Sequence, residues 1–222
     1  MARRKKNYDE EGKGNTFTPF TAKTQKQKEY FNLIRSHQII IGHGSAGSGK
    51  TFVALSAAAE ALYYGHIDKI IITKPLVEAQ EHLGFLPGTV DEKQLPYILP
   101  VRAILDKLLG SSFVNSLIRD RRIEVMPLAY MRGATFDDCY VVADEFQNAT
   151  PGQVKMLLTR IGENSKVIIN GDSKQIDIHG TNGLEDALKR LKWIPGLATI
   201  EFDRNDCVRA QIISDILSAY ED

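Results

Sequence analysis

Short apolar runs alternate with segments of helical periodicity along most of the chain. Six runs are rich in Ile and Val and apolar at consecutive positions, a pattern typical of strands buried on both faces of a parallel sheet. They are Gln38–Ile41, Lys69–Thr73, Ile123–Met126, Tyr140–Ala143, Lys166–Asn170 and Thr199–Phe202. The intervening patterns predict helices over Gln25–Arg35, Lys50–Tyr64, Leu95–Leu109, Pro151–Ile161, Leu184–Leu191 and Val208–Tyr220. This alternation predicts an α/β fold in which helices cover a parallel sheet.

Two regions depart from the alternation. Residues 1–16 are nearly all polar, which predicts a disordered tail. Its basic block, Arg3–Lys6, either contacts phosphates or serves only solubility. The stretch Pro75–Asp120 contains Pro87, Pro96 and Pro100 after its first residue and few strand signals, so we expect an insertion or a set of helices at one edge of the sheet. No internal repeat interrupts residues 17–222, which we interpret as one domain.

Composition narrows the function classes. Of 222 residues, 43% are hydrophobic, and 28 basic residues balance 28 acidic ones, so any nucleic-acid site must be a local patch. The two cysteines, Cys139 and Cys207, lie far apart and fit a reducing compartment. No apolar stretch reaches the ~20 residues of a membrane span, and the basic N-terminus lacks the apolar segment of a secretory signal. We therefore expect a cytoplasmic protein without a membrane partner.

The strongest motif runs from Gly44 to Thr51, GSAGSGKT, and matches G-x-x-x-x-G-K-[ST] in full. A predicted strand precedes it and a predicted helix follows, so its backbone N–H groups would surround phosphate oxygens at a helix N-terminus. Lys50 would bridge the β- and γ-phosphates of ATP, and Thr51 would ligate Mg²⁺. The alternative is a glycine-rich turn without a ligand. The predicted nucleotide-binding residues are Gly44, Ser45, Ala46, Gly47, Ser48, Gly49, Lys50, Thr51 and the adjoining Phe52.

Two later strands end in polar residues. Tyr140–Ala143 runs into Asp144, which would hold Mg²⁺, and Glu145, which would polarise the attacking water. Acids that merely cap a helix are the alternative. A strand placed between the two motifs along the chain is typical of NTPases with an added catalytic Glu. The strand ending at Asn170 is followed by Asp172 and Gln175, which would sense the γ-phosphate or place the water, unless they only form a Gly-Asp turn.

A charge-stabilising arginine is also expected, and the candidates are Arg132, Arg160 and Arg209. For each of them a surface salt bridge is the alternative. The five histidines show no metal-ligand spacing.

Together these motifs resemble the PhoH-like family, phosphate-starvation-inducible ATPases of bacteria and phages. The resemblance covers roughly residues 20 to 221. Besides the P-loop it depends on ITKP (72–75), EAQEHLGFLPG (78–88), PLAYMRG (127–133), DEFQN (144–148), LTRIG (158–162), GDSKQID (171–177) and CVR (207–209).

The resemblance implies a P-loop NTPase with a RecA-like parallel sheet and helices on both faces. It further implies ATP hydrolysis, RNA-linked or single-stranded nucleic-acid activity, and a ring-shaped homo-oligomer such as a hexamer. By position, Gln27 would read adenine, with a solvent-facing residue as the alternative, and Lys74 would contact a nucleic-acid backbone. Phe146 stands where the family often has Ala or Ser, which would alter packing, adenine contacts or subunit contacts. Arg209 would reach the γ-phosphate of a neighbouring subunit.

Four function classes follow from these residues. The first is an ATP hydrolase coupled to a nucleic-acid-bound or protein-bound oligomer. The second is a ring-forming helicase, which needs a neighbouring subunit because the chain offers one RecA-like lobe. A small-molecule kinase would need an arginine-rich lid, which the sequence lacks. A nucleotide-dependent scaffold with little turnover is disfavoured by Glu145.

Overall fold

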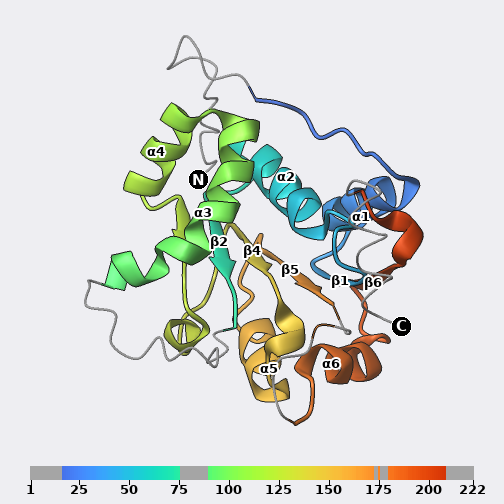
Figure 1. Cartoon of the computed structure of the whole chain (residues 1–222). Helices are drawn as coiled ribbons and strands as arrows, with labels where there is room; N and C mark the ends of the chain where they lie inside the picture. The colour runs from blue at the N-terminus through green and yellow to red at the C-terminus, as the bar shows by residue number, and fades with distance from the viewer. Residues whose placement is uncertain (1–16, 76–89, 173–174, 176–179, 209–222) are drawn as a thin grey trace.

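The computed structural model describes residues 17–75, 90–172, 175 and 180–208. Within them, six strands form one all-parallel sheet in the order β3-β2-β4-β5-β1-β6 (Figure 1). The strands are β1 (Ile39–Gly44), β2 (Lys69–Thr73), β3 (Ile123–Val125), β4 (Cys139–Ala143), β5 (Lys166–Gly171) and β6 (Leu197–Phe202). All six predicted strands are confirmed. The inner strands β1, β2, β4 and β5 are mostly buried, as strands covered on both faces are, whereas the edge strand β6 exposes Thr199 and Glu201.

Helices cover the two faces of the sheet unequally. One face carries α1 (Gln25–Ser36), α2 (Lys50–Tyr63), α3 (Val90–Leu109) and α4 (Ser111–Arg119), and the other carries α5 (Pro151–Leu158) and α6 (Gly183–Leu191) (Figure 1). Short 3-10 turns are η2 (Leu128–Met131), η3 (Phe146–Asn148) and η4 (Arg204–Asp206). The predicted α/β fold, a P-loop NTPase of RecA-like type with helices on both faces, is confirmed.

The differences from the predicted elements are local. The helix predicted from Pro151 stops at Leu158 rather than Ile161, and α3 begins at Val90 rather than Leu95. Helix α4 was not predicted. It packs with α3 near β3, as expected of a helical insertion at the sheet edge. The predicted tail, and almost all of the predicted C-terminal helix, fall outside the described residues.

The order of the strands differs from their order along the chain. Strand β2 follows β1 in the sequence, but in the sheet β4 and β5 lie between them, and β5 is the neighbour of β1. The register pairs Ile41 with Ile169 and Ile169 with Ala143, so these three strands end at one level. The polar segments that follow the strands therefore meet at one edge of the sheet, where ligands of open α/β sheets bind.

Two hydrophobic clusters, one on each face, hold the layers together. Helix α2 presses a row of small residues into the first cluster, so its backbone lies close to the sheet. Phe146 is fully buried in the second cluster, which removes the expectation that it contacts adenine or another subunit. Cys139 is buried. Within the described part of the chain, no helix has the length and apolar character of a bilayer-spanning segment.

Candidate nucleotide site

The loop between β1 and α2 has the curled backbone that its glycines predict. Gly44, Gly47 and Gly49 have φ angles of +107°, +76° and +83°. Residues with a Cβ rarely adopt these values. At Gly44 a Cβ would also lie 2.0 Å from the carbonyl oxygen of Phe202. The loop thus requires glycine for both its conformation and its close approach to β6.

The Lys50 side chain is folded into this loop. Its ammonium donates to the carbonyl oxygens of Gly44 and Ser45, both at 2.8 Å, and to the Ser48 hydroxyl at 3.2 Å. Ser48 in turn donates to the Ser45 carbonyl at 2.9 Å. The positive charge is therefore held inside the cradle where an anionic phosphate chain would be bound.

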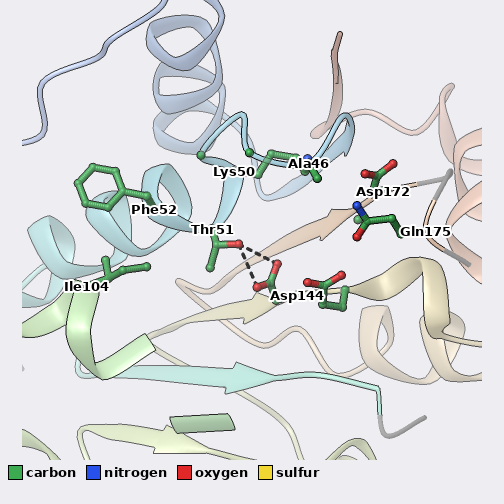
Figure 2. A pocket seen from close by; sticks show the side chains of 12 residues that line it. Ala46, Lys50, Thr51, Phe52, Ile104, Asp144, Asp172 and Gln175 are labelled. Carbon is green, nitrogen blue, oxygen red and sulfur yellow. Dashed lines mark hydrogen bonds between the residues drawn. The ribbon is translucent and has the colours of Figure 1, made fainter. Parts of the chain in front are cut away.

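Thr51 joins the loop to the end of β4. Its hydroxyl lies 3.0 Å and 2.9 Å from the two carboxylate oxygens of Asp144 and donates to them (Figure 2). Burial raises the pKa of Asp144, and the charge of Glu145 adds to this, while the bond from Thr51 and the charge of Lys74 oppose it. A buried carboxylate with this environment is stabilised by a nearby cation.

Glu145 has a strained backbone and two side-chain partners. Its φ of 55° lies in the left-handed region. Gln147 donates to its Oε2 at 2.8 Å, and the Lys74 ammonium lies 3.9 Å from its Oε1. Residues in such conformations often belong to functional sites.

The end of β5 lies beside these acids. Asp172 is buried, and its backbone N–H donates to the Gln147 side-chain oxygen at 3.0 Å. Gln175 is exposed, and its N–H donates to the Asp172 carbonyl at 3.0 Å. Both side chains face the same hollow as Asp144 in Figure 2.

These elements enclose a cleft of about 460 Å³. That volume is within the usual range for small-molecule and cofactor sites. The cleft brings together most of the predicted residues. It adds Gly171, which belongs to the GDSKQID segment, and Ile104, which carries no chemical signal in the sequence. It is lined by Ala46, Gly47, Gly49, Lys50, Thr51, Phe52, Ile104, Asp144, Glu145, Gly171, Asp172 and Gln175.

The remaining residues predicted to bind nucleotide do not line the cleft but support the loop that does. Gly44 and Ser45 supply carbonyls to Lys50, and Ser48 is fully buried. Gln27 is only 3% exposed, so the solvent-facing alternative is wrong. Its amide donates to the Ser48 carbonyl at 2.8 Å and accepts from the backbone N–H of Lys23 at 2.9 Å. Gln27 therefore braces the loop, and adenine reading stays a prediction.

A buried tyrosine supports the sheet beneath the loop. The Tyr30 hydroxyl donates to Asn170 Oδ1 at 2.5 Å, and the ring lies against Gly42, where a Cβ would approach its Cζ to 2.8 Å. Complete burial raises the pKa of Tyr30 well above its usual value, with a further contribution from the charge of Asp144. No local sequence pattern points to this pair, because only the sheet brings α1 and β5 together.

The arginine candidates are not gathered at the cleft. Arg132 is exposed on the surface. Arg160 lies at the end of α5, where its NH1 group donates to the Ala134 carbonyl at 3.4 Å. Neither lines the cleft, and Arg209 lies outside the described residues.

The donor set fits a hard divalent cation completed by phosphate and water. Thr51 and Asp144 offer oxygen ligands, which Mg²⁺ prefers. Among the described residues no group of three His, Cys, Asp or Glu forms a complete metal cage. Mg²⁺ usually binds through one or two protein oxygens plus substrate phosphates, so the two residues suffice.

Comparison with known proteins identifies a consistent set of relatives. The family model described as "PhoH-like protein" matches residues 19–221. The chain is 47% identical over 201 residues to the "PhoH-like protein" of Bacillus subtilis (strain 168), covering 90% of this chain and 63% of that protein. It is 44% identical over 207 residues to "Protein PhoH" of Escherichia coli (strain K12), covering 91% and 58% respectively. The chain thus spans about three-fifths of the length of these two relatives.

Proposed function

The chain belongs to the PhoH-like family, and from this premise we propose that it is a Mg²⁺-dependent ATPase whose nucleotide binds along Gly44–Thr51. The observation that carries the proposal is the pair of hydrogen bonds from Thr51 to Asp144. These bonds join the phosphate-binding loop to the acidic end of β4, as a shared metal site requires.

Each residue has a distinct part in the proposed reaction. Lys50 would exchange its loop carbonyl partners for the β- and γ-phosphates, since its ammonium already lies within the cradle. Thr51 and Asp144 would hold Mg²⁺, which neutralises phosphate charge when bound. Glu145 would accept a proton from the attacking water. The water oxygen then bonds to the γ-phosphorus, the bond to the bridging oxygen breaks, and ADP and phosphate are the products.

The experiment measures phosphate release and equilibrium ATP binding for three variants. Lys50→Ala is expected to lose tight binding, because the phosphate cradle loses its charge. Glu145→Gln is expected to keep binding and to hydrolyse ATP on the order of a hundredfold more slowly or less, since it removes only the base. Glu163→Gln is the matched control, because Glu163 is an exposed carboxylate just before β5, outside the cleft. Hydrolysis at the wild-type rate by Glu145→Gln in Mg²⁺ would remove Glu145 from the mechanism.

We further propose that hydrolysis is coupled to RNA or single-stranded nucleic acid through Lys74, which is 43% exposed beside Glu145. A phosphate at Lys74 would compete with Glu145 for its charge, so nucleic acid would change the ATPase rate. A ring-forming helicase would in addition separate nucleic-acid strands. A nucleotide-dependent scaffold would bind ATP but hydrolyse little of it. The ATPase rate with and without single-stranded RNA and DNA, together with strand-separation assays, separates the three.

A ring-shaped homo-oligomer, such as a hexamer, is part of the same proposal, because one RecA-like lobe supplies only one side of a closed ATP site. In this arrangement Arg209 of one subunit reaches the γ-phosphate of its neighbour. Arg209→Ala and Glu145→Gln proteins would each be nearly inactive, and mixing them would restore some activity at boundaries with both residues intact. No recovery despite demonstrated subunit exchange would exclude a shared site. A reducing, cytoplasmic location belongs to the same proposal, since the two cysteines lie far apart in the sequence.

A further inference from the structure

We propose that Gln147 is a positioning residue, which fixes the Glu145 carboxylate and ties it to the end of β5. Gln147 lies in η3, two residues after Glu145, and its side chain is 1% exposed. The inference rests on the proposed ATPase function and assigns a role to a residue outside the predicted catalytic set.

The two hydrogen bonds of Gln147 are oriented by chemistry. A carboxylate can only accept and a backbone N–H can only donate. The amide nitrogen must therefore face Glu145 Oε2, at 2.8 Å, and the amide oxygen must face the N–H of Asp172, at 3.0 Å. The planar side-chain amide of Gln147 thus connects Glu145, at the end of β4, to Asp172, at the end of β5. The amide cannot be turned round, because its nitrogen cannot accept from the Asp172 N–H and its oxygen cannot donate to the Glu145 carboxylate.

The neighbouring backbone leaves space for this connection. A Cβ on Gly171 would lie 3.0 Å from both the backbone nitrogen and the side-chain oxygen of Gln147. Glycine at this position lets the end of β5 approach η3, and it leaves the space that the Gln147 amide occupies. The position of the Gln147 amide is therefore set by the backbone of η3, of β5 and of Asp172 rather than by one flexible side chain.

Fixing Glu145 in this way matters because its side chain is 38% exposed. A free glutamate side chain rotates about three bonds, and holding it in one conformation costs conformational entropy. Gln147 holds one oxygen and leaves Oε1 facing Lys74 at 3.9 Å. Because Oε2 already accepts from Gln147, Oε1 would be the oxygen that accepts the proton of the attacking water. Displacement of Asp172 by a γ-phosphate would move the same amide and so change the position of Glu145.

The test compares two substitutions of similar size in the full chain. Gln147→Glu keeps an acceptor for Asp172 but places a second carboxylate against Glu145, whereas Gln147→Met removes both hydrogen bonds. Both are expected to reduce kcat by about tenfold to a hundredfold while the Kd for ATP stays within about twofold, since a misplaced base affects turnover and not the phosphate cradle. Gln153→Met is the control, because Gln153 caps α5 and lies outside the cleft, so it loses some stability but no activity.

A spectroscopic measurement tests the contact without turnover. In wild-type protein the side-chain amide of Gln147 should give a shifted NMR resonance, and this resonance should move in Glu145→Ala. Three results would each overturn the inference: a wild-type kcat in Gln147→Met, a Kd for ATP that weakens in parallel with kcat, or a Gln147 resonance that Glu145→Ala leaves unchanged. If the wild-type protein is active in these experiments, the ATPase proposal remains intact. A wild-type protein that does not hydrolyse ATP overturns the ATPase proposal and the inference with it.

Discussion

Replacing Thr51 with Val tests the connection between the phosphate loop and β4. The two side chains have the same shape and similar helix propensity, so the start of α2 is unaffected. The hydroxyl that donates to both oxygens of Asp144, at 3.0 Å and 2.9 Å, is lost. Hydrogen bonds to charged groups contribute about 1.5–3 kcal/mol. Because the cleft admits water, we expect the free energy of unfolding to fall by about 1–2 kcal/mol in the absence of nucleotide.

The loss should depend on pH in a defined direction. Burial holds the pKa of Asp144 above its ordinary value, and the bond from Thr51 opposes that rise, so Thr51→Val raises the pKa further. The folded state then binds a proton more tightly than the unfolded state, and stability falls as the pH rises from the unfolded pKa of about 4 through the folded pKa. Thr51→Val should therefore lower the free energy of unfolding more at pH 8 than near pH 4.

Urea denaturation at several pH values measures the stability, and phosphate release over a range of Mg²⁺ concentrations measures the function. Half-maximal activity in Thr51→Val should require more Mg²⁺, whereas Thr51→Ser, which keeps the hydroxyl, should stay close to wild type. An equal loss in Thr51→Ser, a pH-independent loss in Thr51→Val, or an unchanged Mg²⁺ requirement would refute the reasoning.

Three further predictions address the loop, its support and the exposed cation. Gly44→Ala should lower the free energy of unfolding by about 3 kcal/mol or more, because its φ of +107° and the Phe202 carbonyl both exclude a Cβ, and denaturation at matched pH checks this. Tyr30→Phe should cost about 1–3 kcal/mol, because Asn170 Oδ1 loses its buried donor; an unaltered urea midpoint would contradict it. Lys74→Ala should weaken binding to single-stranded RNA equally across sequences and flatten its salt dependence, measured by fluorescence anisotropy at several salt concentrations.

The sequence by itself determined the strands, the fold class and the chemical core of the site. Runs of Ile and Val fix buried strands because β-branched side chains pack well on both faces of a parallel sheet. The glycines and Lys50 define the phosphate loop because the required backbone angles and charge are local properties. Asp144 and Glu145 could be identified for the same reason, since they follow directly from a predicted strand.

Only the tertiary structure decided what the strand ends do together. That β5 lies between β1 and β4 is a matter of sheet order, which local patterns do not encode. This order lets the backbone N–H of Asp172 reach Gln147, the residue that also holds Glu145. The roles of Gln27, which braces the loop, and Ile104, which lines the cleft from the α3 insertion, depend on packing between segments far apart in the sequence. Which of the alternatives holds for Phe146 was decided in the same way, because its side chain points into the core and acts through packing. Side-chain direction is set by packing on both faces of the sheet, and that packing exists only in the folded chain.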